Sequence, residues 1–171
     1  MSHLWEQKEG IALNKWLEDL QWDINQREIS NVKLGKNNKY AYTEKGIGKI
    51  LSSTPLPTFG DYHIPLRVSD SHTLIGLKST VEGKNFDTAK NCVMWNNLSI
   101  FLNDKNIFNA TIKQGIVGIS VKARGANMLV QFTRTEDEKV GPEIQFDASH
   151  PVYLMGYTNA STKSTVEILT P

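Results

Sequence analysis

Histidines placed two or three residues after an aspartate are the most chemically suggestive feature of this sequence. The pattern Asp-x-His occurs at Asp61–His63 and at Asp70–His72, and the related cluster Asp147–His150 lies further along the chain. Carboxylate, hydroxyl and imidazole groups are the components of hydrolase triads and of metal sites. The spacings match neither a zinc-ligand signature nor the nucleophile elbow Gly-x-Ser-x-Gly. We therefore interpret these residues as turns and strand edges, and we predict no enzyme, no catalytic residue, no cofactor and no metal site.

The residues around the first histidine support this interpretation. Tyr62, Ile64, Leu66 and Val68 alternate with Asp61, His63, Pro65 and Arg67. Alternate side chains of a strand point to opposite faces, so His63 is expected to face outward while the apolar set enters a core. Pro65 favours an edge strand, because proline has no backbone N–H to donate. The following stretch "VSDSHT" is typical of a turn.

Short alternating segments of this kind recur from residue 61 to the end of the chain. Turn signals such as "LNDKN", "ARGAN" and "EKVGP" separate several of them, and no helical pattern intervenes. This succession predicts a mainly β fold: an antiparallel β-sandwich or jelly-roll-like domain over residues 61–171.

The N-terminal segment has a different periodicity. Apolar residues at 13, 16, 17, 20 and 24 follow the spacing of one helix face, which predicts an amphipathic helix from about residue 3 to residue 24. This face must be buried, either on the chain's own sandwich or on a partner. We favour the partner, because aromatic side chains often anchor interfaces. The candidate interface comprises Trp5, Leu13, Trp16, Leu17 and Leu20.

A hairpin and a connector are expected between the helix and the sandwich. The turn residues Gly35, Asn37 and Asn38 separate two strand-like segments, which predicts a β-hairpin. Residues 46–60 are rich in Gly, Pro, Ser and Thr and are interpreted as a connector. The expected domains are thus a helix-and-hairpin arm at 1–45, a connector at 46–60 and a sandwich at 61–171.

Charge argues against nucleic acid as the main partner. The net charge is +1, although residues 33–49 carry five lysines beside Tyr40 and Tyr42. Lysines interleaved with aromatic residues can hold single-stranded nucleic acid, so this hairpin is kept as one alternative. No apolar segment reaches the roughly 18 residues that a membrane-spanning helix needs, and the start of the sequence does not resemble a secretory signal.

These features favour a non-enzymatic assembly protein. By analogy of architecture, the leading hypothesis is a virion component, such as a phage capsid decoration or head–tail protein, that acts as a homo-oligomer. Its expected partners are further copies of itself and another structural protein, and its expected location is the virion, or alternatively the cytoplasm. A carbohydrate- or ligand-binding β-sandwich is the alternative, with Trp95, Tyr153 and Tyr157 as candidate contact residues.

Overall fold

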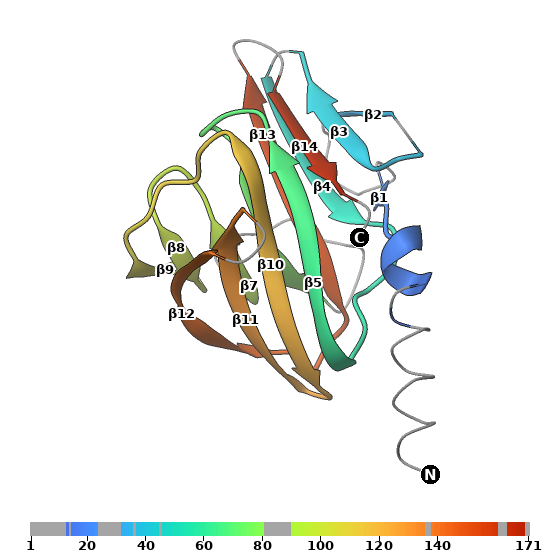
Figure 1. Cartoon of the computed structure of the whole chain (residues 1–171), viewed down its shortest axis with the longest axis vertical. Coiled ribbons are helices and arrows are strands. Elements are labelled where there is room, and N and C mark those ends of the chain that lie inside the picture. The colour runs from blue at the N-terminus through green and yellow to red at the C-terminus, as the bar shows by residue number, and fades with distance from the viewer. Residues whose placement is uncertain are drawn as a thin grey trace.

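The computed structural model describes residues 13, 15–23, 32–35, 37–44, 46–80, 90–135, 138–160 and 164–169. Within these residues the chain forms two seven-stranded antiparallel sheets that face each other as a sandwich (Figure 1). The mainly β, antiparallel fold expected from the sequence is therefore confirmed. No helix of the described part is long and apolar enough to cross a membrane.

The first sheet contains strands from both ends and the middle of the chain. Its order is β1 (Trp22–Asp23), β4 (Gly46–Ser52), β13 (Val152–Ala160), β6 (Leu74–Ser79), β7 (Cys92–Trp95), β8 (Ile100–Leu102) and β9 (Lys105–Phe108).

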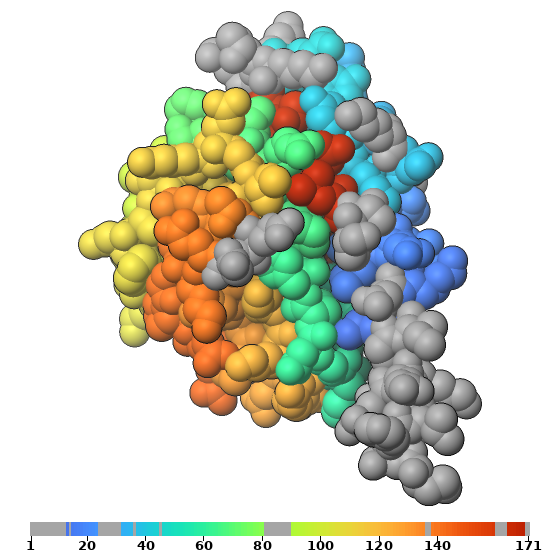
Figure 2. Space-filling model, in the orientation of Figure 1, coloured from blue at the N-terminus to red at the C-terminus, as the bar shows by residue number. Residues whose placement is uncertain are grey.

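The second sheet is the nearer layer in Figure 1, and its outer face fills much of the surface in Figure 2. Its order is β12 (Glu138–Asp147), β11 (Asn127–Arg134), β10 (Gly115–Arg124), β5 (Phe59–Val68), β14 (Ser164–Ile168), β3 (Tyr40–Thr43) and β2 (Lys33–Gly35).

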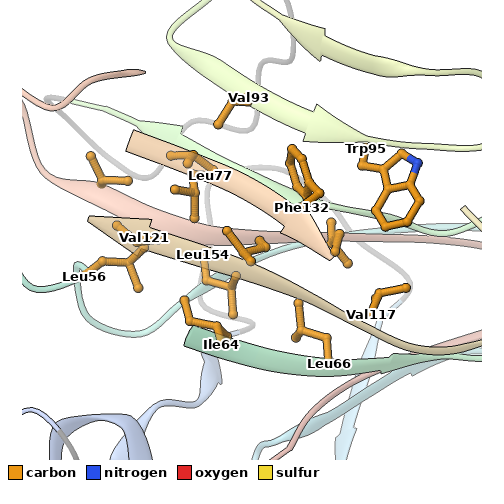
Figure 3. Packing of buried hydrophobic residues seen from close by; sticks show 14 of the residues in the cluster. Leu56, Ile64, Leu66, Leu77, Val93, Trp95, Val117, Val121, Phe132 and Leu154 are labelled. Atoms are coloured by element: carbon orange, nitrogen blue, oxygen red, sulfur yellow. The ribbon is translucent and has the colours of Figure 1, made fainter. Parts of the chain in front are cut away.

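The main core lies between the two sheets and consists of aliphatic and aromatic side chains from both (Figure 3). Trp95 and Phe132 meet there with their ring centroids 5.9 Å apart. Ile64 and Leu66 are fully buried, as the alternation in residues 61–68 predicts. Each such side chain contributes roughly 1.5–3 kcal/mol through removal of its apolar surface from water. The core thus determines which face of each strand points inward and which points away from the other sheet.

A second apolar cluster lies on the opposite face of the first sheet. Because side chains alternate along a strand, Leu51, Leu74, Met94 and Met155 face away from the main core, whose neighbouring members include Ile50 and Ile75. Cys92 completes the buried set, and Phe101, Tyr153 and Tyr157 pack against it. The outer face of this sheet is therefore apolar over part of its width.

Strand β5 is central in its sheet, so the expectation of an edge strand from Pro65 is wrong. Strands β10 and β14 pair with β5 on its two sides. The N–H of Leu169 donates to the carbonyl of Pro65 at 2.9 Å, just beyond the end of β14. Since the amide and carbonyl of one strand residue face the same neighbour, the missing N–H of Pro65 falls where the β14 ladder stops. A central strand accepts proline here because no further pairing follows.

The expected helix of residues 3–24 is shorter where the structure describes it. Residues 15–19 are helical, whereas Trp22–Asp23 form strand β1, which pairs with β4. The N–H of Leu20 donates to the carbonyl of Leu17 at 3.3 Å, a tight final turn. Lys39 then donates its ammonium group to the carbonyls of Glu18 and Leu20, both at 2.7 Å. These bonds satisfy carbonyls that a helix end leaves without partners, so the helix stops before Trp22.

The predicted division into arm, connector and sandwich also differs from the structure. The hairpin is confirmed as β2 and β3, with Asn37 and Asn38 at φ values of 60° and 62° in its turn. However, β3 pairs with β14 inside the second sheet. The expected connector of residues 46–60 contributes β4 to the first sheet and the start of β5 to the second. Gly48 and Ser52 are buried in β4, and a Cβ atom at Gly48 would lie 2.5 Å from the hydroxyl oxygen of Thr158, so at these positions small residues suit a packed strand.

Gly156 illustrates how the N-terminal segment is built into the fold. A Cβ atom at Gly156 would lie 2.8 Å from the ring of Trp22. Trp22 is 1% exposed, and its strand borders β4. The absent side chain on β13 therefore makes room for a large aromatic residue from a distant part of the sequence.

Candidate binding pocket

A pocket of about 360 Å³ lies at one end of the outer face of the first sheet. Strands β4 and β13 contribute Lys49, Tyr157 and Asn159, and Leu74 and Met94 come from β6 and β7. The sheet register aligns Tyr157 with Lys49 on one side and with Leu74 on the other. The pocket is thus a feature of paired strands, and two turns complete its walls.

One wall is the turn between β5 and β6, which supplies His72 and Thr73. The N–H of His72 donates to the carboxylate of Asp70 at 2.8 Å, and the hydroxyl of Thr73 donates to the Asp70 carbonyl at 3.0 Å. Ser69 also donates its hydroxyl to this carboxylate. Asp70 therefore holds the turn, as the sequence predicts, and the turn presents His72 at the pocket.

The opposite wall is the turn between β7 and β8, which supplies Asn96 and Asn97. The side-chain oxygen of Asn96 accepts hydrogen bonds from the N–H groups of Leu98 and Ser99, at 2.8 and 3.1 Å. An asparagine side chain that replaces a backbone acceptor in this way stabilises a tight turn. These two hydrogen bonds hold the side-chain amide of Asn96 in one orientation, with its nitrogen pointing away from the two N–H groups.

The second apolar cluster forms the floor of the pocket. Leu74 and Met94 belong to both, and Tyr157 packs against the cluster while lining the pocket. Gly76 lies on β6, between β13 and β7, and a Cβ atom there would lie 2.9 Å from the methyl group of Met155. Glycine at this position leaves room for the end of the Met155 side chain. Methionine side chains are adaptable, which suits a floor that must fit different shapes.

Two exposed aliphatic residues stand beside the polar walls. Ile47 is 44% exposed and is aligned with Asn159 across β4 and β13. Leu98 is 67% exposed and follows Asn97 in its turn. Scattered single apolar residues on a surface are ordinary, but these two adjoin a pocket with a convergent set of polar groups.

The Asp-x-His motifs do not converge. His63 lies on the outer face of the second sheet, where its Nδ1 atom is 2.9 Å from the hydroxyl oxygen of Ser120. Asp61 forms an ion pair with Arg124 at 2.8 Å. His72 lies at the pocket on the other sheet. Among the described residues, no group of three or more His, Cys, Asp or Glu side chains could hold a metal ion.

The third cluster is a turn, as predicted. The carboxylate of Asp147 accepts a hydrogen bond from the N–H of Ser149 at 2.9 Å. Hydrogen bonds from the side chain and backbone of Ser149 lower the pKa of this carboxyl group. Asp147 therefore serves the turn that leads into β13.

Most of the residues predicted to form an interface pack against the protein's own core. Leu17 and Leu20 are 6% and 1% exposed and belong to the main core, and Leu13 and Trp16 pack against it. Trp5 lies outside the described residues. All four described side chains thus pack on the chain's own sandwich, and the short helix lies beside the sandwich near β1 (Figure 1). Docking of this helix on a partner stays a prediction.

The aromatic and basic residues predicted as binding residues also differ in whether the structure places them at a surface. Trp95 is buried in the main core and donates its ring N–H to the carbonyl of Ala110 at 3.0 Å, which excludes it from a surface site. Tyr153 packs on the second cluster, and Tyr157 lines the pocket. Lys39 is engaged at the helix end, where burial lowers the pKa of its ammonium group against the opposing charges of Asp19 and Glu18.

A smaller pocket lies on the second sheet and is lined in part by Leu129. Its lining includes Lys122 and Arg124. Lys122 is paired with Glu143 at 3.0 Å and Arg124 with Asp61 at 2.8 Å. Its positive charges are thus matched by neighbouring carboxylates.

Comparison with known proteins bears on the fold alone. The sequence matches no protein-family model, and no curated protein matches it. Among solved structures, the TRIM65 PSpry domain has a TM-score of 0.63 at 11% identity, over 94% of this chain and 99% of that one. The SPRY domain of human HERC1 has a TM-score of 0.61 at 17% identity, over 82% of this chain and 94% of that one.

Stonustoxin has a TM-score of 0.63 at 14% identity, over 88% of this chain and 27% of that one, so only part of that protein is similar. Two antiparallel sheets with these structural neighbours show that the chain has the fold of SPRY domains.

Proposed function

We propose that this protein is a non-enzymatic binding module and that a partner protein docks at the pocket on the first sheet. The observation that carries the proposal is the combination of polar walls, an adaptable apolar floor and the exposed side chains of Ile47 and Leu98. Protein interfaces typically combine an apolar contact area with a few placed polar groups. SPRY domains are protein-interaction modules, and this analogy of fold agrees with the proposal without deciding it.

The pocket is also built on rigid supports. Its residues lie on paired strands or on turns held by the side chains of Asp70 and Asn96. Turns positioned by a rigid scaffold are common sites of recognition, because little conformational entropy is lost when a partner binds.

The hypotheses of a virion component and of a homo-oligomer stay predictions. The part of them that relied on an outward-facing helix loses support, because Leu17 and Leu20 are buried within the chain. A carbohydrate-binding role keeps one supporting residue, Tyr157, beside three asparagines. A protein partner explains the two exposed aliphatic side chains better than a sugar does.

Selection of peptides from a random library displayed on phage tests the proposal. We expect peptides that compete with one another for one site and that shift backbone amide NMR signals of residues 72–74, 96–98 and 157–159. Selection of no peptide, or of peptides that shift signals only on the second sheet, would contradict the proposal. Mapping by NMR separates docking from general stickiness, because the latter has no single location.

A further inference from the structure

The pocket of about 230 Å³ on the second sheet lies near the end where β5 begins and β10 turns into β11 (Figure 1). Leu129 of β11 lines it and is aligned with Lys122 of β10 on one side and with Gln145 of β12 on the other. Because Leu129 alternates with the buried Met128 and Val130, it faces away from the core. The surface that this pocket exposes is almost wholly apolar, so the pocket suits an apolar group.

Two ion pairs explain how a pocket with lysine and arginine in its lining can be apolar. The ammonium group of Lys122 on β10 lies 3.0 Å from a carboxylate oxygen of Glu143 on β12, so this pair spans the intervening strand β11. The guanidinium group of Arg124 lies 2.8 Å from a carboxylate oxygen of Asp61 on β5, on the other side of β10. With their charged ends held by carboxylates, the two side chains present their methylene groups as walls of the pocket.

The same face of the sheet carries an exposed aromatic side chain. Phe59, the first residue of β5, is 67% exposed and is aligned with Arg124 in the β5–β10 ladder. A Cβ atom at Gly125 would lie 3.4 Å from the tip of the Phe59 ring, which places the ring beside the β10–β11 turn. Phe59 does not line the pocket, whereas Arg124 does. A projecting apolar ring and an apolar pocket are therefore neighbours at separate places on one face.

We infer that this face binds the same face of a second copy of the chain, with the Phe59 ring of each copy in the pocket beside Leu129 of the other. In a two-fold symmetric interface, every contact between two residues is accompanied by its reverse contact. A ring and a pocket at separate places on one face meet this requirement. An apolar cavity of roughly 150 Å³ holds a benzene molecule, so a pocket of about 230 Å³ has room for a phenyl ring.

The charges beside the pocket favour a second copy over a strongly charged partner. Each of the two cations in the lining has a carboxylate within 3.0 Å in the same chain, so these four groups carry no net charge. Two copies can therefore approach without the repulsion that a surface of one sign would create. The homo-oligomer expected from the sequence is thereby assigned to the second sheet instead of the N-terminal helix. The pocket on the first sheet lies on the opposite side of the sandwich and stays accessible, so the inference is independent of the proposed function.

Sedimentation equilibrium of the full chain, without any partner, tests the inference. Each chain buries its own core and the contact relies on few anchoring side chains, so we expect a folded monomer that dimerises with a Kd on the order of 10–100 µM. Between loading concentrations of about 5 and about 500 µM, the average mass should rise from one chain toward two. A mass that stays at one chain, or that continues to rise beyond two chains, would overturn the inference.

Single variants assign the dimer to this face. Phe59→Ser and Leu129→Ser should each weaken dimerisation at least about tenfold, because either change removes the apolar contact at both symmetry-related places. Leu98→Ser is the matched control, since Leu98 is as exposed as Phe59 but lies at the first sheet, and it should leave dimerisation unchanged. All three positions are exposed, and circular dichroism should show that the variants are folded. Unchanged dimerisation in either folded second-sheet variant would refute the inference.

Mixing Phe59→Ser with Leu129→Ser distinguishes a ring in a pocket from other symmetric arrangements, such as two stacked rings. The first variant keeps the pocket and the second keeps the ring, so a mixed dimer regains one of the two contacts that neither variant forms by itself. We expect the mixture to associate roughly tenfold more tightly than either variant alone. No gain on mixing would overturn the inference. If the unmodified chain stays monomeric while library-selected peptides occupy the pocket on the first sheet, this inference fails and the proposed function stands.

Discussion

Tyr62 carries a prediction at the scale of single residues. Its hydroxyl donates to the carbonyl of Pro57 at 2.9 Å, and burial raises the pKa of its phenol above the ordinary value of 10.0. Tyr62→Phe removes this bond and should lower the free energy of unfolding at neutral pH by about 1 kcal/mol. Urea denaturation at pH 7 measures that difference.

The same variant has an alkaline signature. A raised folded pKa means that the contribution of Tyr62 is fully present below pH 10.0 and is lost as the pH rises above it, because the unfolded phenol ionises first. The stability gap between the two proteins should therefore shrink above pH 10. All other groups titrate in both proteins, so a gap that stays constant or widens would contradict this account of Tyr62.

Lys39 links residue and element, because its ammonium group joins the β2–β3 hairpin to the helix end. Lys39→Gln should reduce the free energy of unfolding by about 1 kcal/mol, since the carbonyls of Glu18 and Leu20 lose their donor. Lys33→Gln is the matched control on the same hairpin. Lys33 forms an exposed ion pair with Glu44 at 3.8 Å, and its replacement should change stability by less than about 0.5 kcal/mol. Equal effects of the two changes in chemical denaturation would show that the helix end does not need Lys39.

At the scale of elements, the N-terminal helical segment is a part of the core. Leu17→Ala should lower the free energy of unfolding by roughly 2–5 kcal/mol, as for other buried leucines. Leu98→Ala, at an exposed position, serves as the control and should change it by less than about 0.5 kcal/mol. If Leu17→Ala left the melting temperature unchanged but abolished self-association, the original docking hypothesis would be correct instead.

The elements differ in how well the sequence predicts them. Strands β5, β12 and β14 follow from alternation, because one face of each is more buried than the other. Strands β6 and β7 are buried on both faces, so short apolar segments and the turns between them indicate these strands instead. Residues 13–20 obey a helical period, yet Trp22 joins a strand, since tertiary pairing with β4 outweighs local preference. The Gly-rich segment of β4 resembles a loop, because its packing depends on strands that follow it by about 100 residues.

The pocket was beyond sequence reasoning for a related cause. His72 and Tyr157 are far apart in the chain and meet only through the pairing of β6 with β13. The sequence predicts the turn at Asp70, and it marks Tyr157 as a candidate contact residue. No local pattern indicates that this turn and Tyr157 line the same pocket. The Asp-x-His motifs, in contrast, resemble catalytic or metal sites in the sequence, but in the structure they lie in a turn and on the outer face of a strand.

For the whole molecule, residues 1–45 supply strands to both sheets, and we therefore expect folding to require them. Deleting residues 1–45 would remove β1, β2 and β3 and take Trp22 and Ala41 out of the core. We expect the truncated protein to lose its cooperative thermal transition, as measured by circular dichroism. A truncated protein with an intact β-sheet spectrum and sharp melting would restore the separation into arm and sandwich.

The central claim is that partners bind at the pocket on the first sheet, and two leucine variants test it most directly. Leu98→Ser alters the rim of this pocket, whereas Leu129→Ser, at a residue 38% exposed, alters the pocket on the second sheet. The affinity of a library-selected peptide should fall about tenfold for Leu98→Ser and stay within about twofold for Leu129→Ser, as measured by calorimetry. Loss of affinity with Leu129→Ser alone would place the binding surface on the other sheet and contradict the account.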